Sequence, residues 1–284
     1  MIIDEVNDDL GLAKPPYRVV ACLAVHGRLP LLEQTIKRLY RKNGCYKVIC
    51  SGDGVEEKKL CESLGAVWIH HPNRHLGGKW NLSFKAAKEY SPDAVVFVGS
   101  SDWLSDNWFS VMRPYVEQYG FAGVPGCHLA DLGEKIRLCD WKGYKEYRHE
   151  RADESIGIGR MLSRRLLDAM GWQPFKPILN NSLDRSMKDN AKKCGFKDFM
   201  VHDDRLKALS VSAPNHWTNK HQFEMHWDGR IPSERLQAEP FLTNHFPEIH
   251  EVFKILYPAT NEKDNRVGRR TSYESSSAQE SNRM

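Results

Sequence analysis

The apolar positions of the chain fall into two repeating kinds of segment. Short apolar runs at 18–25, 46–50, 66–70 and 94–98 have the length of buried strands. Between them the apolar residues recur at the spacing of an amphipathic helix, and Asn43-Gly44 ends the first such stretch. This alternation predicts an α/β fold in which a mostly parallel sheet is flanked by the helices that connect its strands.

Beyond residue 125 the pattern changes. Residues 127–132 and 135–141 are typical of a β-hairpin that turns around Gly133. Helical spacing predicts later helices that begin near Arg160 and Ser182, and a further strand is expected at 206–211. The residues that predict the helix near Arg160 are Met161, Leu162, Leu166, Leu167 and Met170.

The two ends of the chain set the predicted domain boundaries. Residues 261–284 are polar and rich in serine, with too few apolar groups to offset the entropy of ordering, so we expect a flexible tail. Residues 1–16 form an N-terminal extension. The remaining residues, 17–260, predict one domain with a first half at 17–125 and a second half at 126–260.

Composition narrows the class of protein only slightly. The 284 residues include 41 Lys and Arg against 37 Asp and Glu, a net charge of +4 that suits anionic partners but differs from a dense basic arm. Seven cysteines without a CxxC pair argue against a disulfide framework and a structural zinc site. The acidic start resembles no signal peptide and the longest apolar runs are strand-sized, which predicts a cytoplasmic protein without a membrane span.

Polar side chains follow the predicted strands at the points where these strands end. In an open parallel sheet, ligands bind outside the carboxyl ends of the strands, so these turns are candidates for a binding site. Each turn taken alone is more commonly an ordinary solvated loop. The candidate side chains that follow the four strands are His26, Arg28, Asp53, Lys79, Asn81, Ser101 and Asp102.

Three segments in the same order resemble the GT-A glycosyltransferases, most closely those of family 2. They are the strand and turn at 48–54, the Gly78-Lys79-Trp80-Asn81 segment, and the apolar strand with its acidic turn at 94–104. The resemblance extends from about Arg18 to His216. It implies a Rossmann-like GT-A fold, a nucleotide-sugar half at 17–125 and an acceptor half at 126–260 that contains the hairpin.

The resemblance also implies roles for the donor-side residues. Asp53 would face the base or ribose of the nucleotide. Lys79 would neutralise the diphosphate, helped by the positive potential at the amino terminus of the helix that Asn81 opens. His26 and Arg28, in the turn after the first strand, belong to the same expected donor site.

A divalent cation is expected from the same resemblance. In GT-A enzymes an Asp-x-Asp turn holds Mn²⁺ or Mg²⁺ against the diphosphate of the donor. Here Gly99 and Ser101 stand where carboxylates are usual, so Asp102 carries the acidic function together with the Ser101 hydroxyl. His216 is the expected second ligand to the metal or diphosphate.

Asp184 is the expected catalytic residue. It lies where the family has an Asp at a helix start, which inverting members use as the general base that deprotonates the acceptor hydroxyl. An Asp in the first turn of a helix also interacts favourably with the helix dipole, so a purely structural role is the alternative.

Two other functions compete with a glycosyltransferase. A nucleotidyltransferase also uses a doubly wound sheet, although it usually has a glycine-rich basic loop after the first strand. The basic and aromatic residues at 141–149, together with Lys188, Lys192, Lys193 and Lys197, are compatible with a non-catalytic nucleic-acid-binding protein. The glycosyltransferase and the nucleic-acid-binding interpretations can also be combined, in a transferase whose acceptor is a modified base in DNA.

Overall fold

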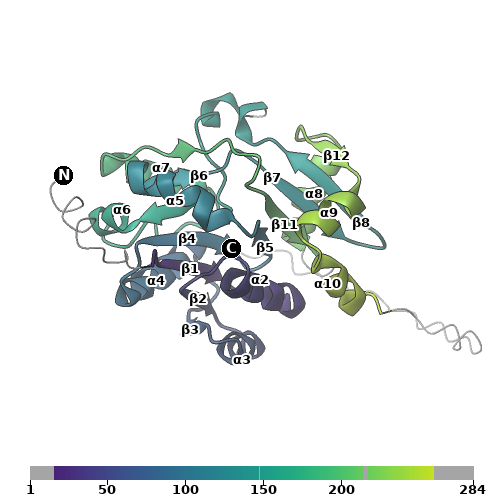
Figure 1. Ribbon diagram of the computed structural model, residues 1–284, viewed down its shortest axis with the longest axis horizontal. Helices are drawn as coiled ribbons and strands as arrows, with labels where there is room; N and C mark the ends of the chain where they lie inside the picture. Colours follow the sequence, from purple (N-terminus) through teal and green to yellow (C-terminus); the bar gives the residue numbers. More distant parts are fainter. Residues whose placement is uncertain (1–15, 147, 214–216, 259–284) are drawn as a thin grey trace, which may run out of the picture.

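A seven-stranded sheet forms the centre of the protein. The computed structural model describes residues 16–146, 148–213 and 217–258. The strands of this first sheet lie in the order β10-β6-β9-β4-β1-β2-β3 (Figure 1). Their bounds are β1 Val19–Ala24, β2 Lys47–Gly52, β3 Val67–His70, β4 Ala94–Gly99, β6 Phe121–Gly123, β9 Met161–Ser163 and β10 Phe199–Met200.

The first sheet is mostly parallel. Strand β1 pairs in parallel with β2 and β4, and β2 pairs in parallel with β3. Strand β9 runs antiparallel to β4 and β6, whereas β10 is parallel to β6. Ala24 pairs with both Ser51 and Gly99, so β1, β2 and β4 end at the same edge of the sheet.

Helices cover both faces of this sheet because both faces of its central strands are apolar. Val19, Ala21 and Leu23 point into one core with α2, α3 and α5, while Val20 and Cys22 point into a second core with α4, α6 and α7. The helices are α2 Leu29–Arg41, α3 Val55–Ser63, α4 Leu76–Ala87, α5 Trp108–Tyr119, α6 Arg164–Ala169 and α7 Leu183–Lys193. A short 3₁₀ helix, η1 Lys88–Tyr90, extends α4.

A second, five-stranded sheet lies beside the first, on the right of Figure 1. Its order is β12-β8-β7-β11-β5, and its own core includes residues of α9 and α10. Two 3₁₀ helices, η2 Tyr144–Glu146 and η3 His149–Arg151, follow β8. The other elements are β5 Asp102–Leu104, β7 Cys127–Leu132, β8 Ile136–Trp141, β11 Ala208–Ser212, β12 Glu234–Leu236, α8 Trp217–Trp227, α9 Ala238–His245 and α10 Ile249–Leu256.

The α/β class, the mostly parallel sheet and the hairpin are confirmed. Strands β7 and β8 pair antiparallel from Cys127 with Trp141 to Leu132 with Ile136, around the expected turn. The helix predicted from Arg160 is wrong at its start, because residues 161–163 form strand β9 between β4 and β6. Met161 and Leu162 are fully buried there, and α6 begins only at Arg164.

Two further expectations concern the ends of the chain and the membrane. Apart from Pro16, the N-terminal extension at 1–16 and the C-terminal tail at 261–284 lie outside the described residues. Within the described ranges, none of the helices combines the length and the apolar character that crossing a membrane requires.

Candidate functional site

The polar turns after β1, β2 and β4 meet at one edge because β1 lies between the other two strands. From β1 the chain builds β2 and β3 on one side, and it then returns to place β4 on the other side. Such a reversal leaves a crevice outside the carboxyl ends of the two strands at which it occurs. In this protein those strands are β1 and β4, whose following turns carry Arg28 and Asp102.

Arg28 connects the turn after β1 with the turn after β4. Its Nη1 donates to Ser101 Oγ at 2.7 Å and its Nη2 to Ser100 Oγ at 3.1 Å. Its guanidinium also lies within electrostatic reach of Asp102. Burial lowers the pKa of Arg28, and the Asp102 carboxylate opposes this effect. The expected residues Arg28, Ser101 and Asp102 therefore form one cluster.

Asp102 folds back onto its own turn. Its Oδ2 accepts a hydrogen bond from the Gly99 N–H at 3.0 Å, and the hydroxyl of Ser210 also bonds to the carboxylate. Burial raises the pKa of Asp102, whereas Ser210, Arg28 and the Gly99 N–H lower it. A Cβ on Gly99 would lie 2.4 Å from Asp102 Oδ2, so the Asp102 carboxylate takes the space of a side chain at position 99.

A second cluster lies after β1 and β2. Asp53 accepts hydrogen bonds from the N–H of Asn73, at 3.3 Å, and from its side-chain amide. The Asn73 amide also contacts His26 Nδ1 at 3.1 Å, and its Oδ1 accepts a hydrogen bond from Lys79. Lys79 donates in addition to the carbonyl oxygen of Val25. The structure thus brings His26, Asp53 and Lys79 together through Asn73, which sequence reasoning did not single out.

Lys79 is a buried cation. Only 3% of its surface is exposed, although it lies at the edge of the sheet. Burial lowers the pKa of Lys79 to about 8, and the carboxylates of Asp53 and Glu57 oppose the shift. Lys79 therefore loses its charge close to neutral pH, at a far lower pH than an exposed lysine.

The amino terminus of α4 is closed by the loop at 176–180. The N–H groups of Leu76, Gly77 and Gly78 donate to Asn180 Oδ1 and to the carbonyl oxygens of Leu179 and Pro177, at 2.9, 2.8 and 2.9 Å. These are the donors that would bind an anion at a helix start. The expected help of the helix amino terminus to the diphosphate is therefore not available, because protein atoms already accept these hydrogen bonds.

Asn81 faces the same loop and not the donor-side clusters. Its Nδ2 donates to the carbonyl oxygen of Phe175 at 2.8 Å, and its Oδ1 accepts from the Phe175 N–H at 3.1 Å. Only 4% of Asn81 is exposed. The pair of hydrogen bonds fastens α4 to the segment that leads into α7.

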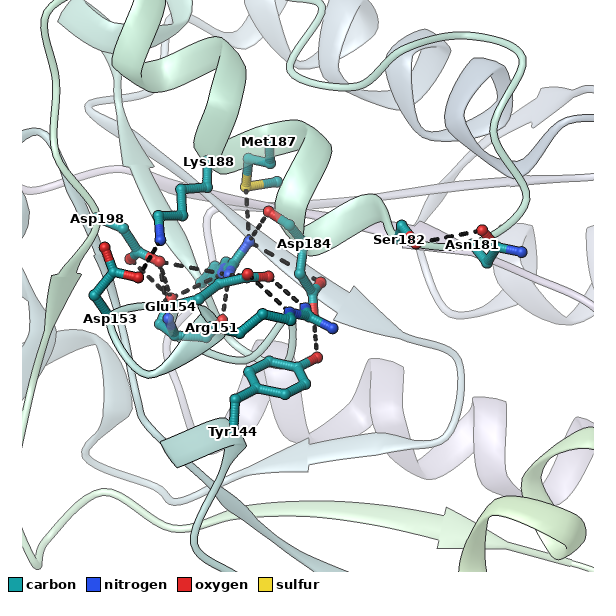
Figure 2. A network of polar contacts seen from close by, with 12 residues as sticks. Tyr144, Arg151, Asp153, Glu154, Asn181, Ser182, Asp184, Met187, Lys188 and Asp198 are labelled. Carbon is teal, nitrogen blue, oxygen red and sulfur yellow. Dashed lines mark hydrogen bonds and ion pairs between the residues drawn. The ribbon is translucent and has the colours of Figure 1, made fainter. Parts of the chain in front are cut away.

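Asp184 lies in the first turn of α7, with 22% of its side chain exposed (Figure 2). Its Oδ2 accepts a hydrogen bond from the Tyr144 hydroxyl at 3.2 Å, and its Oδ1 lies 4.0 Å from Arg160 Nη1. The backbone of Gly157 passes so close that a Cβ there would lie 2.4 Å from Oδ1. The carboxylate is thus confined on three sides.

Arg160 holds the backbone of Asp184 in place, and it was not among the site residues expected from the sequence. The side chain is fully buried and donates from Nη1 to the backbone oxygen of Asp184 at 2.8 Å. It also donates from Nε to Ser155 Oγ at 2.8 Å and lies 3.5 Å from Asp198. The one signal for Arg160 in the sequence was its charge directly before the apolar residues Met161 and Leu162. These residues predict a buried segment without polar neighbours.

The carboxylates of Asp102 and Asp184 lie within electrostatic reach of one another. Asp102 begins β5 shortly after β4 of the first sheet, and Asp184 lies in the first turn of α7 in the second half of the chain. Both also act on the buried thiol of Cys127, which starts the hairpin of the second sheet. The first half and the second half therefore meet at these acidic side chains.

The structure tests the expected metal ligands only in part. His216 lies outside the described residues. Among the residues that the structure does describe, no three His, Cys, Asp or Glu side chains gather as metal ligands. At the turn after β4 the donor set is a single carboxylate that faces the guanidinium of Arg28, which does not fit a cation that prefers several oxygen ligands.

The sequence matches no protein-family model, and none of the curated proteins compared with it is significantly similar. The geometry and the chemistry of the site are therefore the basis for inferring its function.

Proposed function

We propose that the protein is a glycosyltransferase of the GT-A fold that moves a sugar from a nucleotide diphosphate to an acceptor hydroxyl. The observation that carries the proposal is that Asp102, beside the point where the strand order reverses, and Asp184, 82 positions later in the chain, lie within electrostatic reach of one another. A transferase needs a donor site and a base on the acceptor side within reach of the same sugar.

The donor site of the proposal combines two clusters. Lys79 and Arg28 are two cations at the turn after β1, and in the proposal they together neutralise the charge that develops on the departing diphosphate. Asp53, exposed at the end of β2, accepts hydrogen bonds from the base or the ribose. His26 borders the same site through its contact with Asn73.

The reaction proposed here is a single displacement. The oxygen of the acceptor hydroxyl forms a bond to the anomeric carbon while the bond from that carbon to the diphosphate breaks. The proton of the hydroxyl passes to the carboxylate of Asp184, and the electron pair of the broken bond leaves with the nucleoside diphosphate. Arg28 and Lys79 stabilise this leaving group.

No step of the proposal passes through a divalent cation, because the part of the donor set around Asp102 that the structure describes does not fit one. Arg28 supplies positive charge where a cation would otherwise act. We therefore expect turnover to persist in excess EDTA, and stimulation by Mn²⁺ of more than about tenfold would restore a metal to the mechanism.

DNA with a hydroxylated base is the acceptor that we propose. Exposed cations lie on α6, at the end of α7 and just after it, namely Arg164, Arg165, Lys192, Lys193 and Lys197. Arg165 and Lys197 line a surface hollow there with Phe196, and Arg165 lies over the ring of Phe196. The distance from Lys192 to Asp184 is about 12 Å along α7, so phosphates bound at these cations leave a base within reach of the site.

The proposal also includes a cytoplasmic location. The seven cysteines are unpaired and all but Cys194 are buried, which suits a reducing compartment.

The decisive experiment measures nucleoside diphosphate released from nucleotide sugars. A thermal-shift screen of UDP-, GDP- and dTDP-sugars selects the donor, because a ligand that binds the native state raises its melting temperature. Asp184→Asn should lower turnover by about a thousandfold or more and leave donor affinity nearly unchanged. Full activity of Asp184→Asn would refute the assignment of the base.

The same assay separates the proposal from a nucleotidyltransferase. A glycosyltransferase releases nucleoside diphosphate from a nucleotide sugar. Release of pyrophosphate from a nucleoside triphosphate, without use of a nucleotide sugar, would support the nucleotidyltransferase instead. Binding of nucleic acid without turnover of either substrate would support a non-catalytic protein.

A further inference from the structure

The hydroxyl of Tyr144 gives the carboxylate of Asp184 a hydrogen bond from a different part of the fold. Tyr144 lies in η2, after the last strand of the hairpin, and its hydroxyl donates to Asp184 Oδ2 at 3.2 Å (Figure 2). The two residues are 40 positions apart. Burial and the nearby Asp184 carboxylate raise the pKa of Tyr144, so the hydroxyl keeps its proton and remains a donor at neutral pH.

The ring of Tyr144 is itself held in place. Arg151 lies over it, with Cζ 3.5 Å from the ring centroid. Arg151 is fixed in turn by the buried carboxylate of Glu154, to which its Nε donates at 2.9 Å and its Nη2 donates as well. Glu154, Arg151, Tyr144 and Asp184 thus form a chain of contacts that begins in the interior and ends at the proposed base.

We propose that Tyr144, clamped by Arg151, is a positioning residue that orients Asp184 for proton transfer from the acceptor. This inference rests on the proposed function. A carboxylate on a helix's first turn can rotate, and a fixed donor on Oδ2 leaves Oδ1 with a defined direction. Tyr144 also belongs to the basic and aromatic segment at 141–149, so at least this residue of the segment acts at the proposed site.

Other charged groups around Asp184 do not take over this task. Arg160 lies at 4.0 Å from Oδ1 and gives its short hydrogen bond to the backbone oxygen of Asp184. Asp102 on β5, the Cys127 thiol on β7 and Arg151 interact with Asp184 electrostatically, without a hydrogen bond to its carboxylate. Among these groups, Tyr144 is the one whose side chain donates a hydrogen bond directly to the carboxylate.

The test compares Tyr144→Phe with the wild-type chain in the turnover assay, with the selected nucleotide sugar and water as acceptor. The ring and its contact with Arg151 remain, so only the hydroxyl is lost. We expect kcat to fall about ten- to one-hundredfold, the value of a hydrogen bond to a charged group, with the donor KM unchanged within about twofold. The acid limb of the pH–rate profile should move to higher pH, because the carboxylate loses a donor that favours its charged form.

Tyr257→Phe is the matched control. The Tyr257 hydroxyl donates to the carbonyl oxygen of Leu132 at 2.8 Å, in the second sheet and away from Asp184. This variant should lose a comparable hydrogen bond and keep kcat and the pH profile of the wild type. Arg151→Gln, which frees the ring of Tyr144, should give a smaller loss of kcat in the same direction.

The outcomes separate the inference from the proposed function. If Asp184→Asn is inactive but Tyr144→Phe keeps the wild-type kcat and acid limb, the positioning role is wrong and the transferase proposal survives. If Tyr144→Phe only lowers the melting temperature, its role is structural and the inference is again overturned. If the wild-type chain turns over no nucleotide sugar, or Asp184→Asn is fully active, the proposed function fails first.

Discussion

At the scale of single residues, Lys79 is a cation whose hydrogen-bond acceptors are neutral. Its ammonium donates to the carbonyl oxygen of Val25 and to the amide oxygen of Asn73. The carboxylates of Asp53 and Glu57 act on it only through space. A buried charge without a bonded carboxylate is costly, and an anionic ligand relieves that cost. In the proposed function, the diphosphate of the donor is that anionic ligand.

Lys79 gives a prediction about pH. Since its pKa is lowered to about 8, the side chain becomes neutral as pH rises through that value, and a bound diphosphate then loses an ionic contact. We expect the affinity for UDP or the matching diphosphate to fall about tenfold between about pH 7 and pH 9.5. Isothermal titration calorimetry at several pH values measures this change.

Two variants control the experiment on Lys79. Lys79→Met should bind the diphosphate weakly at every pH, whereas Lys59→Met, which changes an exposed lysine on α3, should keep the wild-type profile. An affinity of the wild-type chain that does not vary over this range would show that Lys79 does not contact the phosphates.

Arg28 adds a conformational observation at the same scale. Its φ of 59° is in the left-handed region, which costs a residue with a Cβ about 1 kcal/mol or more. The backbone holds this conformation while the side chain bonds to Ser100 and Ser101. Such strain is commonly retained where a side chain must be presented at a site, which agrees with a role next to the diphosphate.

At the scale of elements, the contact of α4 with the segment at 175–180 is the feature that shapes the site. This segment accepts the hydrogen bonds of the first turn of α4 and is bound through Asn81. Gly77 allows the close approach, since a Cβ there would lie 2.2 Å from the carbonyl oxygen of Lys176. The contact holds Lys79 on one side and the start of α7 on the other.

Asn81→Ala should therefore reduce stability and leave ligand binding intact. Two hydrogen bonds with the buried backbone of Phe175 are lost, so we expect the free energy of unfolding to fall by about 2–4 kcal/mol in urea titrations. Asn190→Ala, which removes one hydrogen bond to the carbonyl oxygen of Pro174, should cost about 1 kcal/mol. If Asn81→Ala keeps the wild-type stability but loses affinity for the diphosphate, Asn81 belongs to the donor site and its proposed structural role is wrong.

At the scale of the whole molecule, the two sheets share the turn that follows β4. Asp102 begins β5, which pairs with β11 in the second sheet directly after the chain leaves the first. Arg38 on α2 strengthens the junction through Asp106 and Glu248 and through the carbonyl oxygen of Leu104. The acidic turn is thus fixed by both sheets and faces the second half of the chain.

The proposed DNA acceptor gives a prediction at this scale. Changing Lys192 and Lys193 together to Glu should weaken binding of duplex DNA by about tenfold or more at about 0.1 M salt. The slope of log affinity against log salt should also become shallower by about two, because two phosphate contacts are lost. Gel-shift titrations over a range of salt concentrations measure both quantities.

The control for the DNA experiment changes Lys58 and Lys59 to Glu. These two exposed lysines are on α3, which lies well apart from α7 in Figure 1. Equal effects of both double variants would show that binding follows net charge only. DNA binding that does not depend on salt in the wild-type chain would rule out phosphate contacts at α7.

Much of the first half of the fold followed from the sequence alone. The strands β1 to β4, the helices α2 and α4 and the hairpin of β7 and β8 agree with the predicted segments within a few residues. Their signals are local, since an apolar run or a turn residue acts within a few positions of the chain. The rule that parallel strands end at one edge predicted that the polar side chains after these strands lie at that edge, but the tertiary structure divides them into one cluster of Arg28, Ser101 and Asp102 and another of His26, Asp53 and Lys79.

The tertiary structure decided what depends on distant partners. Met161 and Leu162 form a strand because β4 and β6 offer free edges on both sides. Asn81 forms hydrogen bonds with a residue 94 positions away, and the first turn of α4 forms one with a residue 104 positions away. No local sequence pattern therefore predicts that protein atoms occupy the hydrogen-bond donors at this helix start. Tyr144 meets Asp184 only after η2 has been placed against α7. Local preferences set each strand and turn, whereas the direction of a side chain's hydrogen bonds is fixed by whichever segment packs against it.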